Sequence, residues 1–229
     1  MSRLSFHRKP DFISNLSAVT FLLITAAVLY FSPQRQALDA LNFDLLTVIS
    51  ADEKPDQALV IIGIDDQSFA NLNVQWPWPR GVHAHLLEQV KKQSPRAIVF
   101  DILFSEPSEP SEDELFAQAL MGETPVVMAS ERAFQQTEYA QIITDVLPLP
   151  SFLASGAIPG DVGIQNDPDQ GVRLLPGQES AMWRKTLEAI ASNDKTALPN
   201  SSDSVNRYIK YVGSRGTIPT ISYYQALFA

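Results

Sequence analysis

The sequence predicts an α/β fold: a mostly parallel three-layer sheet domain preceded by one transmembrane helix. Three observations lead to this class. An uncharged, largely apolar run of about twenty residues lies at 12–31. Three short apolar runs that suit buried strands follow at 58–64, 97–100 and 125–129. Segments with helical spacing of apolar residues separate these runs, and this alternation is typical of a parallel sheet.

Composition excludes several classes of function. The chain has 229 residues, 45% of them hydrophobic, and a mean hydropathy of -0.04, which is enough for a real core. With no cysteine, it cannot form a disulfide, a thiolate metal site or a cysteine nucleophile, and three histidines leave little material for a metal centre. A net charge of -9 argues against nucleic-acid binding. No cofactor is expected.

The first thirty-one residues resemble a signal anchor. The uncharged run 12–31 follows a basic head with Arg3, Arg8 and Lys9, which the positive-inside rule places in the cytoplasm. A cleavable signal peptide is the alternative, but Tyr30-Phe31-Ser32-Pro33 is a poor small-residue cleavage site. We therefore expect a cytoplasmic segment at 1–11, an inner-membrane anchor at 12–31 and a periplasmic or extracellular domain at 34–229.

The outer part begins with an amphipathic helix and an α/β alternation. Within 34–57, Leu38, Leu41, Leu45 and Leu46 form one apolar helical face. A strand over 58–64, a helix over 80–92 and a strand over 97–100 follow, the two strands being buried on both faces. The capping box Ser111-Glu112-Asp113-Glu114 opens the next helix, and a third strand covers 125–129.

Beyond Ser130 the periodicity weakens. The pattern predicts a turn at 167–171 and a polar linker at 192–203. It also predicts strands near 161–165, 172–175 and 208–212, and helices near 181–191 and 221–227.

Three acids form the first candidate site. Asp65 and Asp66 follow one predicted strand and Asp101 follows the next, and ligands of open α/β sheets bind beyond the carboxyl ends of strands. Clustered carboxylates suit a polar ligand or a divalent cation. The alternative, which we favour, is that each acid caps a following helix or turn.

The segment Trp76-Pro77-Trp78-Pro79-Arg80 forms the second candidate site. Its stiff backbone and large rings suit a ligand-facing wall or a docking loop. Alternatively, the tryptophans pack beneath the loop and Arg80 pairs with an acid such as Asp65 or Asp101.

No catalytic or metal-binding residue is predicted. The chain contains no G-x-S-x-G, P-loop or G-x-G-x-x-G motif, and Ser68 has no evident base near it in sequence. His83 and His85 are two residues apart, which points them away from each other on a helix. The candidate ligand-binding residues are therefore Asp65, Asp66, Ser68, Trp76, Trp78, Arg80 and Asp101.

The order of four blocks resembles the second type of CHASE domain, an extracytoplasmic sensor of bacterial signalling proteins. These blocks are 60–68 (VIIGIDDQS), 76–80 (WPWPR), 98–107 (IVFDILFSEP) and 167–173 (DPDQGVR). The resemblance implies a membrane-anchored α/β sensor that signals to a cytoplasmic nucleotide cyclase, diguanylate cyclase, histidine kinase or Ser/Thr kinase. The sequence departs from the family at Gln170, which is inserted in the family's Asp-Gly-x-x-Arg turn.

The resemblance also sets expectations for organisation and partners. Because no second span or output module occurs through Ala229, we expect a non-enzymatic sensor portion. Its expected partners are the membrane, an unidentified small-molecule or protein stimulus, and a second copy, since output modules of these classes work in pairs. Two other classes compete: a periplasmic metal-dependent hydrolase using Asp65, Asp66 and Asp101, and an interaction module anchored by Trp76 and Trp78.

Overall fold

The computed structural model describes residues 12–32, 35–51, 58–136, 141–194 and 207–228. The chain divides into two compact units, Met1–Asp52 and Glu53–Ala229. The first unit contains two helices, α1 (Phe12–Tyr30) and α2 (Arg35–Ser50). Both helices were predicted, and both are confirmed.

The role predicted for the first helix is not supported. α1 forms over the expected residues, and its described leucines, valines and phenylalanine are exposed. Within the part of the chain that the structure describes, however, no helix combines the length and the apolar character needed to cross a membrane.

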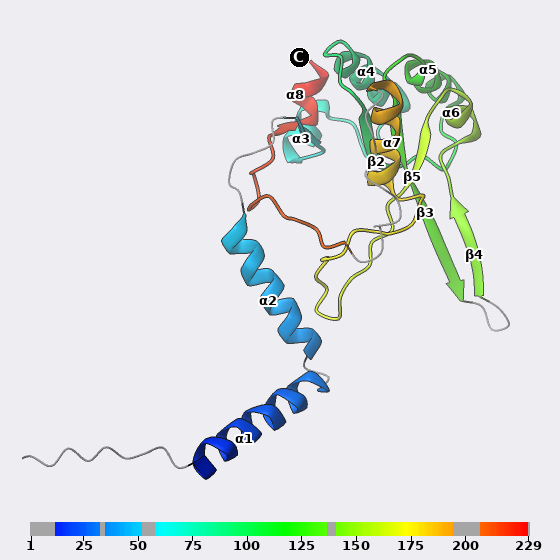
Figure 1. Ribbon diagram of the computed structural model, residues 1–229. Helices are drawn as coiled ribbons and strands as arrows, with labels where there is room; N and C mark the ends of the chain where they lie inside the picture. The colour runs from blue at the N-terminus through cyan, green and yellow to red at the C-terminus, as the bar shows by residue number, and fades with distance from the viewer. Residues whose placement is uncertain (1–11, 33–34, 52–57, 137–140, 195–206, 229) are drawn as a thin grey trace, which may run out of the picture. The chain divides into compact units, whose positions relative to one another are not determined.

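Within the described ranges, the strands and the remaining helices belong to the second unit (Figure 1). Its elements in chain order are β1 (Ile61–Gly63), α3 (Asp66–Leu72), α4 (Arg80–Lys91), β2 (Ile98–Leu103), α5 (Pro110–Leu120), β3 (Val126–Gln136), β4 (Gln141–Val146), α6 (Pro150–Ala154), β5 (Ile158–Asp161), α7 (Met182–Asp194), β6 (Thr220–Ser222) and α8 (Tyr223–Leu227).

The strands do not form the single, mostly parallel three-layer sheet that was predicted. β1 pairs in parallel with β6 in a separate two-stranded sheet. β3 pairs in parallel with β2 and β5, and its second half forms an antiparallel ladder with β4. The prediction missed this ladder because the sequence after Ser130 has no clear alternation of apolar and polar residues, so β3 was ended at residue 129.

Two apolar clusters form the core of this unit, and α4 contributes to both. The larger cluster contains Ala84 and Leu87 of α4 together with buried residues of β2, β3, α5 and α6. The smaller one contains Leu86 of α4 and buried residues of α8. α7 packs closely against β5. A Cβ on Gly160 of β5 would lie 2.8 Å from the Cα of Met182 in α7, so the glycine permits this close approach.

α4 and α5 are joined at both ends. The carboxylate of Glu112 accepts a hydrogen bond of 2.5 Å from the Gly81 amide at the start of α4. At the other end, Lys91 Nζ donates to the Ala119 and Met121 carbonyls at 2.6 and 2.8 Å, which occupies acceptors at the end of α5. The predicted capping box is wrong, since α5 begins at Pro110 with Glu109 at the N-cap.

Several other predictions changed in detail. The expected strands at 172–175 and 208–212 are reduced to one bridge between Leu174 and Tyr208. The strand expected at 161–165 is instead β5, which ends at Asp161, and most of the predicted linker lies outside the described residues. Short helices α3 and α6 had not been predicted.

Candidate functional site

Asp65 lies at the centre of a hydrogen-bond network that joins the two ends of the second unit. Its Oδ1 accepts bonds from the Ser68 amide at 2.9 Å and the Ser68 hydroxyl at 2.6 Å, so it caps α3. Ser222 Oγ, at the end of β6, donates to the same oxygen at 2.9 Å. The hydrogen bonds from Ser68, and secondarily that from Ser222, lower the pKa of Asp65. The capping alternative is thus confirmed for Asp65.

The three predicted acids do not form a cation site. β1 pairs with β6 and not with β2, so Asp65 and Asp101 do not end neighbouring hydrogen-bonded strands. Asp101 lies inside β2, where the register with β3 shifts, and Asp66 is an exposed residue of the first turn of α3. Among the residues described, no group of three acidic or histidine side chains is arranged to hold a metal ion. The hydrolase alternative therefore loses the cluster on which it was based.

The two tryptophans differ sharply in exposure. Trp78 is 2% exposed and belongs to the smaller core cluster, whereas Trp76 is 41% exposed. The Trp78 ring lies 4.9 Å from the Tyr223 ring and 5.4 Å from the Trp76 ring, between centroids. Trp78 therefore packs beneath the loop, and Trp76 retains a surface on which a ligand can lie.

Arg80 pairs with an acid that had not been predicted. Its Nε lies 3.6 Å from Asp113 Oδ1 in α5, and its guanidinium lies 4.6 Å from the centroid of the Phe104 ring. It also donates to the Glu106 carbonyl at 3.2 Å. The expected partners Asp65 and Asp101 are wrong, and Arg80 joins α4 to α5 and the loop after β2.

His83 and Tyr223 form a buried pair of titratable groups in this region. His83 is 1% exposed, and its Nδ1 lies 2.8 Å from the hydroxyl of Tyr223, which is itself 2% exposed. Burial, with a smaller contribution from the Arg80 charge, lowers the pKa of His83 to about 4. Burial also raises the pKa of Tyr223. The pair is therefore neutral at physiological pH, and it connects α4 to α8.

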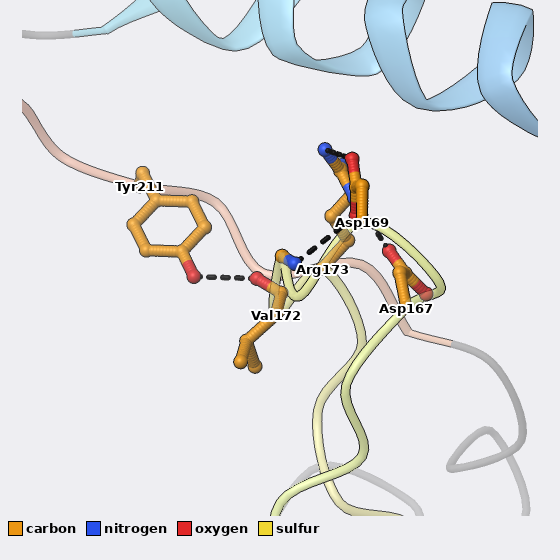
Figure 2. Close-up of polar contacts among 6 residues, drawn as sticks. Asp167, Asp169, Val172, Arg173 and Tyr211 are labelled. Carbon is orange, nitrogen blue, oxygen red and sulfur yellow. Dashed lines mark hydrogen bonds and ion pairs between the residues drawn. The ribbon is translucent and has the colours of Figure 1, made fainter.

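The turn at 167–173 forms an ion-paired loop (Figure 2). Arg173 is 7% exposed and donates through Nη1 to Asp167 and through Nη1 and Nη2 to Asp169, each at 2.8 Å. Hydrogen bonds from Arg173 and the Gly171 amide lower the pKa of Asp169 to about 2. A Cβ at residue 171 would lie 2.5 Å from Arg173 Nη1, so a larger residue there would have to displace the guanidinium from its present position. The inserted Gln170 is accommodated by a left-handed backbone, with φ of 67°.

This loop yields a stability prediction. We expect Arg173→Lys to lower the free energy of unfolding by about 1–2 kcal/mol, because an ammonium cannot replace the planar guanidinium that holds both aspartates. Arg132→Lys is the matched control, since Arg132 and Asp145 form an exposed pair at 3.1 Å whose loss should be nearly neutral. Urea denaturation of both variants measures the difference. Equal losses would show that the ion pairs of Arg173 stabilise the fold no more than an exposed pair does.

A cavity of about 410 Å³ lies between β1 and β2 and was not predicted. It is lined by Leu59, Val60, Ile61, Ile62, Ile64, Leu86, Leu87, Val90, Ile98, Val99, Phe100, Asp101, Ile102 and Tyr223. Asp101 is the one charged side chain in this set, and the other residues are apolar or aromatic. Its size is in the range of small-molecule sites.

The comparisons decide the family. A family model described as the CHASE2 domain matches residues 19–228. The chain belongs to the CHASE2 family. No curated protein and no solved structure matches it. CHASE2 is a sensor domain of signalling proteins rather than a catalytic domain, and it is extracytoplasmic, which supports a sensory role and a periplasmic location for this chain.

The CHASE2 fold places the predicted ligand residues in different settings. Asp65 and Ser68 belong to the cap network, Trp78 to the core and Arg80 to the joint between α4 and α5. Asp66, Trp76 and Asp101 have exposed side chains. Sequence reasoning missed the roles of His83, Tyr223 and Ser222, because their partners lie more than a hundred residues away along the chain. For Arg173, the sequence did offer an indication, because it belongs to the block DPDQGVR at 167–173 that resembles the family.

Proposed function

We propose that this chain is the extracytoplasmic sensor region of a bacterial transmembrane signalling protein. The observation that carries the proposal is the CHASE2 match over 19–228, which spans most of the chain. In this role the domain detects a small-molecule or protein stimulus outside the inner membrane. It then changes the activity of a cytoplasmic nucleotide cyclase or kinase of the same signalling protein.

Attachment to the inner membrane through 12–31 is part of the proposal. It is supported by the uncharged run and by the basic head with Arg3, Arg8 and Lys9. This part rests on the sequence, since the described helices do not meet the requirement for a span. The N-terminus would then be cytoplasmic and the second unit periplasmic.

Transmission is proposed to pass through α2 in a homodimer. Apolar side chains recur at spacings of three and four residues along one face of α2, and all of them are about half exposed or more: Leu38, Leu41, Leu45 and Val48. An isolated helix of this length is marginal in water. This spacing is that of a coiled-coil seam, so a second α2 would cover it. A stimulus would act by shifting the equilibrium between two arrangements of the pair.

Cysteine crosslinking tests attachment and dimerisation together. The chain contains no cysteine, so Leu41→Cys and Leu45→Cys each introduce a single thiol. We expect these variants to be recovered in washed inner membranes and to form disulfide-linked dimers with a mild oxidant. Asn42→Cys, one residue off the seam, should crosslink several-fold less. Equal crosslinking at 41 and 42 would contradict the α2 seam, and recovery in the soluble fraction would contradict the anchor.

The stimulus is proposed to contact the exposed members of the predicted ligand set. Trp76 offers a half-exposed ring, and the carboxylates of Asp66 and Asp101 are accessible. Asp65 is exposed as well, but its Oδ1 is already bonded to Ser68 and Ser222. Together with the buried Ser68 and Trp78 and the partly buried Arg80, it would position these groups rather than touch the ligand.

A further inference from the structure

The cavity between β1 and β2 follows the edges of two strands. Consecutive residues line each wall: 59–62, which lead into β1, on one side and Ile98–Ile102 of β2 on the other. No residue of β6 or β3 lines it. Neighbouring side chains of a strand point to opposite faces, so a groove lined by consecutive residues lies along the strand edge. Leu86, Leu87 and Val90 of α4 also line it.

Each wall carries backbone groups that no described strand pairs. Within the described residues, β1 pairs only with β6, and β2 pairs only with β3. The amides of Ile61 and Ile98 donate to the Pro219 and Pro125 carbonyls on those paired sides. Since alternate amides of a strand point to opposite edges, the amides of Val60, Ile62 and Val99 point toward the groove. The groove thus has hydrogen-bonding groups along both sides.

The amino-acid sequences of β1 and β2 are typical of strands that are more deeply buried than these two strands are. Runs such as ALVIIGI at 58–64 are typical of strands buried on both faces of a sheet, and that burial was predicted. The prediction is wrong for the described structure, in which Ile61 and Val99 are each 44% exposed. An apolar surface bordered by unpaired strand edges favours the addition of another strand.

We propose that this groove binds one extended polypeptide strand, which pairs with β1 on one side and β2 on the other. Aliphatic or β-branched side chains of that strand would contact the exposed parts of Ile61 and Val99 and the partly buried Val90 of α4. A basic residue of the strand would lie near Asp101, the one charged side chain of the lining. Strand addition of this kind combines backbone hydrogen bonds for affinity with side-chain contacts for selectivity. The proposal does not rest on the sensory role.

The experiment uses a phage-displayed library of random decapeptides selected against the full chain in detergent micelles. We expect the selected peptides to be rich in valine and isoleucine, to lack proline centrally and to carry one basic residue. The strongest peptide is then synthesised and its affinity measured by fluorescence anisotropy. Hydrogen exchange on the complex should show new protection of the amides of Val60, Ile62 and Val99, whereas the Ile61 amide is already bonded to Pro219.

Groove variants then locate the peptide. Val60→Pro removes an amide that faces the groove, and Val99→Lys places a charge on the opposite wall. Each should weaken binding about tenfold or more. Ile143→Lys is the matched control, because Ile143 is a 58% exposed strand residue of β4 and does not line the groove. It should leave the affinity unchanged.

Three results would overturn the proposal. These are that the selection enriches no peptide above background, that the selected peptide binds all three variants equally, and that the amides of Val60, Ile62 and Val99 stay unprotected in the complex. Should the fluorescent dye ANS bind in the groove while every peptide fails, the groove is instead a small-molecule site. Hydrogen exchange is measured on the unaltered chain and reports directly on the strand edges. The proposal therefore remains testable even if Val60→Pro does not fold.

Discussion

Replacing Trp78 with alanine should lower the free energy of unfolding by about 3–5 kcal/mol, a loss comparable to those seen when large core aromatics are truncated. Trp78 is 2% exposed and packs in one cluster with Leu86 of α4 and Tyr223 of α8. Its Nε1 donates to the Val74 carbonyl at 3.2 Å, so the substitution also leaves that acceptor without its partner. The cavity left behind would loosen the contact between α4 and α8.

Trp76→Ala is the matched control for this prediction. Trp76 is the same residue type in the same loop, but it is 41% exposed, so its truncation should cost about 1–2 kcal/mol. Urea denaturation followed by far-ultraviolet circular dichroism measures both losses. Equal losses would contradict the assignment of Trp78 to the core and Trp76 to the surface. If both losses were small, both rings would instead be available as surface anchors for docking.

Acidification should destabilise the domain by about 3 kcal/mol through His83 alone, at roughly 1.4 kcal/mol per pKa unit. The ordinary pKa of histidine is 6.5, and burial lowers that of His83 to about 4 in the folded state. The unfolded chain therefore binds a proton more readily than the folded one. Stability from this group is fully present above pH 6.5 and is lost as the pH falls toward 4.

The pH dependence of unfolding in His83→Gln isolates this effect. We expect its stability to change less between pH 6.5 and 4 than that of the unaltered protein. His85→Gln should retain the full dependence, because His85 is an exposed residue of the same helix. Asp169, whose pKa is lowered to about 2, contributes mainly at lower pH and does not mask the effect. An unchanged slope in His83→Gln would refute the prediction.

Apolar spacing and helix-ending residues in the sequence correctly predicted α4 and the first halves of β2 and β3. The helix over 80–92 was predicted from apolar spacing and from Ser94-Pro95 after it, and α4 covers Arg80–Lys91. The strands predicted at 97–100 and 125–129 correspond to β2 and β3, but both strands extend further, to Leu103 and Gln136. The predictions stopped at the first polar residues, Asp101 and Ser130. The β3–β4 ladder was missed for the same reason, since exposed strands lack the apolar run that marks a buried one.

The candidate site depended on contacts that local patterns do not encode. The pairing of Asp65 with Ser222 crosses 157 residues, and that of His83 with Tyr223 crosses 140. Sequence reasoning correctly favoured a cap at Asp65, because the acid stands just before a turn of helix. It chose the wrong acids for Arg80, because only the packing of α4 against α5 brings Asp113 to the guanidinium.

The parallel pairing of β1 with β6 has a consequence for how the chain reaches its folded state. Residues 61–63 pair with residues 220–222, so β1 has no native strand partner in the described fold until the ribosome has made nearly all of this domain. At about 5–20 residues per second, that delay is on the order of ten to thirty seconds. During this time a strongly apolar segment stays available to other chains and to chaperones. Biogenesis, more than final stability, should therefore be the step most sensitive to substitutions in 58–64.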